Sequence, residues 1–387
     1  MNGPLAKPLA GPWAEARRLL VMRLDNIGDV VMTGPVLHAI KENLPGASVT
    51  LMASPGGSKA ATLLPGVDEV LDWRVLWQDL GRLSFDPARE FTMIEALRRG
   101  SYDAVVILTS FKQTPHVAGY ACYLAGIPLR LGESKEWGGG VLTDEAPPAP
   151  DELHQVERNL RLIEHAGFHV EDRSLRVRVP EEARTTAAVL LKARGVSPNA
   201  SYLLLNPWAS VQARTYPPDR FALAARQLSK QTGWPVVVTG TEAERARSAD
   251  VLDVLVDGGV NLVGATELPE LAALVEGARL VLTNNTSTMH LLDALRTPGV
   301  VLFSGTELEE QWRPRHTPHR LLRRETWCSP CHAFTCPYDL ECLDIPPGEV
   351  AQAGLSLLNE VGDRHADRYV DRYVDRYAEA PQEESRA

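Results

Sequence analysis

The sequence predicts an α/β protein made of two doubly wound domains that face each other across a cleft. The first observation is its length, because 387 residues are enough for two domains that each bury a core. The second is that short apolar runs of strand length alternate with helical stretches in both halves. The third is a shift to Gly and Pro over residues 138–151, which is typical of a connection between domains.

The composition is that of a folded soluble chain and argues against several classes of protein. Hydrophobic residues make up 44% and charged residues 23% of the chain, as in globular proteins. The net charge of -10 argues against general nucleic-acid binding, because such proteins present a basic surface to phosphate. No apolar run approaches the roughly 18 residues of a membrane span, and the start lacks a signal-peptide core. We therefore expect a cytoplasmic protein.

The first half begins with a predicted strand over residues 18–24, a polar turn over 25–29 and a helix over 30–42. The intervals between the strands that follow are long enough for crossover helices, which favours a parallel sheet. A further helix is expected at 153–166, and the connection between the domains lies between there and about Pro198. The other predicted strands of this half are 48–52, 69–72 and 103–108.

The second half repeats this alternation. Its predicted strands are 202–206, 235–239, 279–283 and 300–303, and its predicted helices are 218–232, 268–276 and 288–295. Beyond Leu358 the chain is polar and has no apolar face, so we expect a disordered tail. We divide the chain into an N-terminal extension (1–17), a first domain (18–180), a second domain (181–358) and the tail (359–387). Sheets of this kind bind ligands at the carboxyl ends of their strands, which places the active site between the domains.

The turn after the first strand carries the first candidate for chemistry. It lacks the glycine spacing of a dinucleotide site, and the chain has no P-loop motif. Gly28 permits a close turn, and Asp29 is expected to point from the helix start into the cleft, where a carboxylate can accept the proton of a hydroxyl. A purely structural role for Asp29 or Asp25 as a helix cap is the alternative.

The second half offers groups that suit a nucleotide diphosphate. Arg214 lies on a loop after a strand and supplies a cation. Residues 283–290 end a strand in hydroxyl and amide side chains where a helix begins, and free backbone amides there suit a phosphate. Glu242 follows the strand 235–239, where a carboxylate can hold ribose hydroxyls. The alternatives are a solvated Arg214, a plain helix cap with His290 packed inside, and a surface Glu242.

In this order along the chain, the segments 23–29, 206–217, 240–242 and 284–290 resemble the landmarks of glycosyltransferase family 9, over roughly residues 18–358. The resemblance implies the GT-B fold, with two facing Rossmann-like domains and an interdomain cleft. It also implies inverting transfer of a sugar without an essential metal. The family includes the ADP-heptose transferases of lipopolysaccharide inner-core synthesis. The partners implied are a nucleotide-diphosphate sugar and a lipid-linked or other envelope glycan acceptor.

The resemblance also implies roles for residues at matching positions. Asp29 matches the catalytic base, with Arg23, Asn26 and Gly28 on the acceptor side. The implied donor-binding residues are Arg214, Thr215, Glu242, Asn285, Thr286, Ser287, Thr288 and His290. The family commonly has Asp-Thr-Gly where this chain has Asn285, Thr286 and Ser287. The lost carboxylate is expected to alter the contact to the donor sugar, and the serine to narrow the turn beside the diphosphate.

Four cysteines lie close together in sequence and need their own explanation: Cys328, Cys331, Cys336 and Cys342. Their spacing is compatible with a structural zinc ion or an iron-sulfur cluster. Free thiols are the alternative, and disulfides are disfavoured in a reducing cytoplasm. No cofactor is expected in catalysis itself.

Two other functions remain open at this stage. A nucleotide-sugar epimerase on the same fold would need no acceptor cleft, and a catalytically silent paralogue would bind a sugar nucleotide or a glycan without turnover. The basic residues between Arg313 and Arg324 suit acidic lipid headgroups or an anionic acceptor, although such a run is also typical of a solvated face. Peripheral contact with the inner face of the cytoplasmic membrane is therefore part of the expectation.

Overall fold

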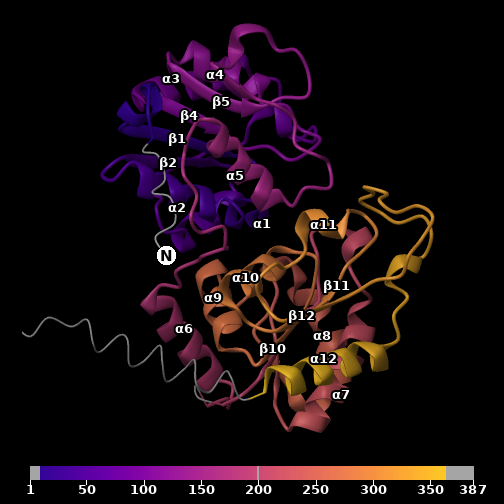
Figure 1. The fold of residues 1–387 in the computed structure, drawn as a ribbon. Coiled ribbons are helices and arrows are strands. Elements are labelled where there is room, and N and C mark those ends of the chain that lie inside the picture. The colour runs from indigo at the N-terminus through magenta and orange to yellow at the C-terminus, as the bar shows by residue number, and fades with distance from the viewer. Residues whose placement is uncertain (1–8, 198–199, 363–387) are drawn as a thin grey trace, which may run out of the picture.

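The chain forms two parallel six-stranded sheets, each with helices around it (Figure 1). A computed structural model describes residues 9–197 and 200–362. The strand order is β3-β2-β1-β4-β5-β6 in the first sheet and β12-β11-β10-β7-β8-β9 in the second. From its other edge, the second sheet has the order β9-β8-β7-β10-β11-β12, in which β7 to β12 correspond to β1 to β6. The second sheet therefore repeats the topology of the first. The prediction of two doubly wound α/β halves with the same architecture is confirmed.

The strands are short, and the central ones are buried. The first sheet contains β1 (Arg18–Arg23), β2 (Ser48–Ala53), β3 (Glu69–Asp72), β4 (Ala104–Ile107), β5 (Leu129–Glu133) and β6 (Asp144–Ala146). The second contains β7 (Leu203–Asn206), β8 (Val236–Val238), β9 (Gly259–Asn261), β10 (Leu280–Asn284), β11 (Gly299–Leu302) and β12 (His319–Leu322). Continuous Val and Leu runs such as β11 are typical of parallel strands covered on both faces.

The helices connect the strands and cover the sheets. Those of the first half are α1 (Ile27–Val31), α2 (Gly34–Asn43), α3 (Pro87–Arg99), α4 (His116–Leu124) and α5 (Gln155–His165). The remaining helices are α6 (Glu181–Lys192), α7 (Pro218–Thr232), α8 (Ser248–Leu255), α9 (Leu268–Gly277), α10 (Ser287–Leu295), α11 (Glu309–Trp312) and α12 (Pro347–Val361).

The single helix predicted over residues 30–42 is wrong, because the segment forms α1 and α2 with a break between them. Pro35 stands in the first turn of α2, a position that tolerates its missing N–H and favours the start of a new helix. The sequence reading also missed β5, β6, β9 and β12. These strands are three to five residues long, which is too short for a clear period-two pattern.

The two halves contact each other closely. Helix α1 packs against α10, and the connecting chain is tied to the second half by a hydrogen bond of 3.0 Å between His154 Nε2 and the Arg313 carbonyl. Helix α6 lies against α9 (Figure 1). In the described ranges no helix has the length and apolar character that a membrane crossing requires. The predicted tail lies outside the described residues from 363 onward.

Candidate active site

A cleft of about 710 Å³ lies between the two sheets and is lined by residues from both halves. On the first side it is lined by the loops after β1 and β4, and on the second by those after β7, β8, β10 and β11. These loops meet because the carboxyl ends of all the strands of a parallel sheet lie at one edge. The predicted position of the site between the halves agrees with this geometry.

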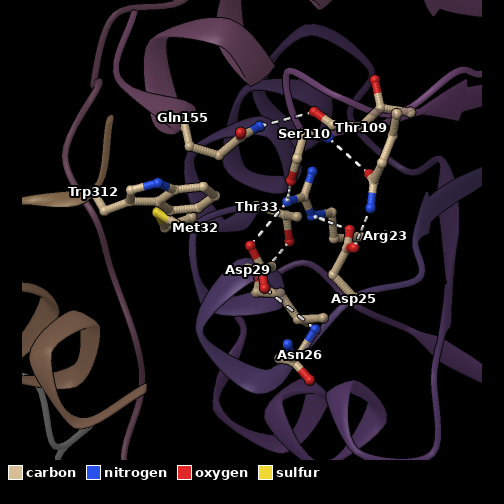
Figure 2. Close-up of polar contacts among 12 residues, drawn as sticks. Arg23, Asp25, Asn26, Asp29, Met32, Thr33, Thr109, Ser110, Gln155 and Trp312 are labelled. Atoms are coloured by element: carbon tan, nitrogen blue, oxygen red, sulfur yellow. Dashed lines mark hydrogen bonds and ion pairs between the residues drawn. The ribbon is translucent and has the colours of Figure 1, made fainter. Parts of the chain in front are cut away.

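Asp29 lies in the first turn of α1 and lines the cleft. Its carboxylate accepts a hydrogen bond of 2.9 Å from Arg23 Nη2 and one of 3.2 Å from the backbone N–H of Asn26 (Figure 2). The structure therefore contains the helix cap that was the alternative interpretation. The capping hydrogen bonds leave part of the Asp29 side chain accessible, since 16% of its surface is exposed. A carboxylate fixed in this way at a cleft wall has the geometry of a general base.

Arg23 does not reach the cleft, although it was predicted among the acceptor-side residues. Its side chain is completely buried and lies 3.1 Å from Asp25 as well as 2.9 Å from Asp29. It also donates to the Ser110 hydroxyl over 2.8 Å (Figure 2). A buried guanidinium is tolerated only beside such partners. Arg23 therefore holds the two carboxylates in place from the protein interior and does not contact a ligand.

Asp25 is a second carboxylate at this wall of the cleft. Burial raises its pKa, the Arg23 charge opposes that change, and the nearby Asp29 charge adds to it. Gln113 donates a hydrogen bond of 2.5 Å to its Oδ1. The sequence reading treated Asp25 only as a helix cap. The strand-end rule points equally to Asp25, because it follows β1 directly.

Gly28 and Asn26 line the cleft as predicted for the acceptor side. The reason for the glycine differs from the expected close turn. A Cβ at position 28 would lie 2.6 Å from His290 Cδ2 in α10, a distance that real contacts do not reach. Gly28 therefore lets the two halves approach each other. Burial lowers the pKa of His290 to about 4, which keeps the imidazole neutral near pH 7.

Arg214 lines the second wall of the cleft, in the turn before α7. Its Nη2 lies 2.5 Å from Glu307 Oε1. Within the described chain its Nε is buried without a hydrogen-bond partner, so one donor remains for a ligand. Thr215, predicted beside it, is outside the cleft lining, because its hydroxyl donates to the Val211 carbonyl over 3.0 Å.

The start of α10 forms part of the second wall. All five predicted residues of this segment line the cleft: Asn285, Thr286, Ser287, Thr288 and His290. Asn285 is only 5% exposed, and neither polar atom of its amide has a hydrogen-bond partner among the residues that the structure describes. A buried amide costs free energy unless it is paired. Together with the free N–H groups of a helix start, it marks a place for a polar ligand.

Glu242 does not line the cleft, in contrast to its predicted role at the ribose. Its carboxylate is 70% exposed and forms an ion pair of 2.6 Å with Arg245. Glu244, two residues later, lines the cleft instead and accepts hydrogen bonds from the N–H and the hydroxyl of Thr241. The turn after β8 directs the second acid, not the first, toward the cleft.

Glu307 is the residue that the sequence reading missed most clearly. It follows β11 and lines the cleft beside Arg214. The signal was available, because β11 was predicted and its carboxyl end had to lie at the same edge as the others. Trp312 of α11 also lines the cleft, and Figure 2 shows its indole reaching toward the cluster around Asp29.

The four cysteines are free thiols in the structure. Over the described residues, no group of three or more His, Cys, Asp or Glu side chains is placed to hold a metal ion. Burial raises the pKa of Cys342, and the other three thiols raise it further, so each of them lies within electrostatic reach of Cys342.

Four of the five arginines in the basic segment from Arg313 to Arg324 pair with glutamates of the same chain: Arg315 with Glu157, Arg320 with Glu360, Arg323 with Glu309, and Arg324 with Glu349. Arg313 is exposed. Contact of this segment with lipid headgroups or an anionic acceptor stays a prediction.

Comparison with known proteins agrees with this architecture. The chain is 27% identical over 305 residues to lipopolysaccharide heptosyltransferase 3 of Escherichia coli, covering 74% of this chain and 82% of that protein. The crystal structure of a family 9 glycosyltransferase from Veillonella parvula superimposes with a TM-score of 0.72 at 20% identity, over 89% of this chain and 97% of that one. The E. coli ADP-heptose lps heptosyltransferase II gives a TM-score of 0.70 at 22% identity, over 89% and 99%.

The two structural matches establish the GT-B fold, with its facing Rossmann-like halves. The family model described as "Glycosyltransferase family 9 (heptosyltransferase)" matches residues 91–341. This range is more than half of the chain, and its segments line the second wall of the cleft and part of the first. The protein is therefore a glycosyltransferase and belongs to family 9.

Proposed function

We propose that this enzyme transfers a heptose from ADP-heptose to a lipopolysaccharide inner-core acceptor, with inversion at the anomeric carbon. The observation that supports this most strongly is the opposition across one cleft of Asp29, in the first half, to Arg214 and the start of α10, in the second. A base on one wall and diphosphate-binding groups on the other are what a transfer reaction requires. The names of the relatives described above supply the sugar and the acceptor.

The reaction follows from the groups at the two walls. Asp29 accepts the proton of an acceptor hydroxyl, and the hydroxyl oxygen forms a bond to the anomeric carbon from the face opposite the nucleotide. The bond from that carbon to the diphosphate oxygen breaks, and its electron pair leaves with ADP. The transition state has oxocarbenium character. Arg23 stays behind Asp29 and fixes the direction of its carboxylate.

The leaving diphosphate gathers negative charge, and the second wall carries groups that stabilise it. Arg214 supplies a cation with an unused buried N–H, and the start of α10 supplies backbone amides and the positive end of the helix dipole. These groups are sufficient to hold a diphosphate, so we propose that catalysis does not depend on a metal ion. A chelator is expected to leave the rate unchanged.

The acceptor is expected on the first wall, where Lys59 and Lys112 line the same cleft as Asp29. Lys59 lies 3.3 Å from Glu267 Oε2. Cations at this place suit an anionic core saccharide. Because the acceptor proposed here is anchored to lipid, we propose that the enzyme works in the cytoplasm, in peripheral contact with the inner face of the cytoplasmic membrane.

The test is transfer by the purified enzyme from ADP-heptose to heptose-free lipopolysaccharide, followed by ADP release and by the mass of the acceptor. The proposal predicts one heptose added for each ADP released. ADP-heptose binding without turnover, with several core acceptors, would identify a silent paralogue. An altered sugar nucleotide formed without acceptor would identify an epimerase. Failure to bind ADP-heptose would contradict the proposed donor.

The structural metal predicted at the cysteines stays a prediction. The other three thiols lie within electrostatic reach of Cys342, yet the described side chains do not form a group that holds a metal ion as they stand. Metal analysis of the purified protein decides the matter. About one zinc or one iron-sulfur cluster per chain, lost on replacement of Cys328 and Cys331 together, would support the metal site.

A further inference from the structure

Glu307 lies on the second wall of the cleft. It belongs to the turn after β11, in which the hydroxyls of Ser304 and Thr306 lie 2.9 Å apart. The backbone N–H of His332 donates to the Thr306 carbonyl over 3.0 Å and ties the turn to the cysteine segment. The Glu307 side chain keeps only 18% of its surface exposed. The carboxylate is therefore presented to the cleft by a turn with little freedom.

One oxygen of this carboxylate is engaged, and the other is not. Oε1 lies 2.5 Å from Arg214 Nη2. Oε2 has no hydrogen-bond partner in the part of the chain that the structure describes. A carboxylate oxygen can accept several hydrogen bonds, and Oε2 is not among the buried atoms that lack a partner, so it is accessible from the cleft. Oε2 is therefore free to accept a hydrogen bond from a ligand.

The charged groups around Glu307 indicate which part of the ligand lies beside it. Burial raises the pKa of Glu307, Arg214 lowers it, and the Asp29 charge on the opposite wall raises it. Asp29 and Arg214 therefore both lie within electrostatic reach of this one carboxylate. In the transfer proposed above, the group between the base and the diphosphate is the sugar ring itself.

The chemistry of the ligand also favours a sugar over a phosphate at Oε2. A diphosphate carries only acceptors and negative charge near neutral pH, so a carboxylate repels it. A sugar hydroxyl donates, and hydrogen bonds from hydroxyls to carboxylates are among the stronger ones. Asn285, where the family commonly has a carboxylate, lines the same cleft with both amide atoms unpaired. Glu307 is then one of the carboxylates on this wall, with Glu244, and it is the one that lies beside Arg214.

We propose that Glu307 is a donor-specificity residue: Oε1 holds Arg214 in place for the diphosphate, while Oε2 accepts a hydrogen bond from a hydroxyl of the transferred sugar. This assignment rests on the proposed donor site. In this assignment Glu307 contacts the sugar, whereas Arg214 contacts only the diphosphate. The enzyme thereby discriminates a sugar nucleotide from the free nucleotide that remains after transfer.

The test compares Glu307→Gln with wild type, using ADP and ADP-heptose as separate ligands in calorimetry. Glutamine keeps the shape and still accepts from Arg214, but it lacks the negative charge. The expected result is a loss of about 10- to 100-fold in ADP-heptose affinity, the range for one hydrogen bond to a charged group. The ADP affinity is expected to change by less than about threefold, because its phosphates do not meet Oε2. The matched control is Glu309→Gln, which removes a carboxylate of α11 that lies outside the cleft lining.

Two results would overturn the proposal. An equal loss for ADP and ADP-heptose would show that Glu307 acts only through Arg214. Unchanged affinity for both would show that it contacts neither. If wild type prefers another nucleotide, the same comparison is made with GDP and GDP-mannose or with UDP and UDP-glucose. A wild type that binds a different pair contradicts the ADP-heptose proposal alone, and Glu307 is then judged on that pair. If wild type binds none of them, both proposals fail.

Discussion

Gly28→Ala is the substitution for which the structure predicts the clearest steric effect. The added Cβ would lie 2.6 Å from His290 Cδ2, 3.3 Å from His290 Nε2 and 3.5 Å from the Ser287 Cα. The first distance is far inside ordinary contact, and the imidazole that must shift is buried, with 7% of its surface exposed. Overpacking of this kind costs about 1–3 kcal/mol. Since α1 and α10 belong to opposite walls, we expect the walls to separate while each half stays folded.

The consequence is a loss of transfer without a matching loss of nucleotide binding. Separation of the walls moves Asp29 away from the donor, and a cost of 1–3 kcal/mol corresponds to about 5- to 150-fold in kcat/KM. The dissociation constant for ADP is expected to stay within about threefold, because the proposed nucleotide site lies on the second wall. Steady-state kinetics and calorimetry measure the two quantities on the same preparation.

Two variants make this prediction decisive. Gly56→Ala adds the same methyl group on the same wall, where its nearest neighbour is the Ser54 Oγ at 3.9 Å, and it is expected to have almost no effect. His290→Ala in the Gly28→Ala background removes the opposing ring and is expected to recover part of the rate. Wild-type kcat/KM in Gly28→Ala, or an equal loss in Gly56→Ala, would refute the reasoning.

Three further predictions concern Arg214, Arg23 and His154. Arg214→Ala is expected to raise the Kd for ADP by about 10- to 100-fold, because a charge-assisted hydrogen bond is lost; calorimetry measures it, and an unchanged Kd contradicts the phosphate role. Arg23→Met leaves Asp25 and Asp29 without their cation and is expected to lower the free energy of unfolding by about 3–5 kcal/mol in urea titrations; a change below about 1 kcal/mol would speak against the buried cluster. Burial lowers the pKa of His154 from 6.5 to about 4, so the unfolded chain takes up a proton before the folded one, and stability is lost as the pH falls from about 6.5 toward 4. His154→Gln is expected to flatten this part of the stability profile, whereas His165→Gln on the surface is expected to leave it unchanged.

The fold was predictable because its strongest signals are local. The apolar runs of β1, β7, β10 and β11 have the length of strands and lie between polar turns, and this combination predicts them. The break between α1 and α2 was missed, although Pro35 is a signal for the start of a new helix. The edge strand β6 contains two acidic residues in three, and its identity depends on pairing with β5, which no local pattern reveals.

The candidate site was predictable only in part, since position along the chain does not give the direction of a side chain. Asp29, Arg214 and Asn285 line the cleft because they lie in the loops or helix starts that follow strand ends. Glu242 and Arg23 point elsewhere, each because a charged neighbour satisfies it. Such pairings depend on tertiary contacts, and sequence spacing does not report them.

Asp29→Asn tests the central claim most directly, since it asks whether this carboxylate is the base. We expect kcat for heptose transfer to fall by about 10²- to 10⁴-fold, while the Kd for ADP stays within about threefold. Asp25→Asn, which removes the other carboxylate on Arg23, is expected to retain more activity. A kcat for Asp29→Asn within threefold of wild type, or a larger loss in Asp25→Asn, would contradict the account.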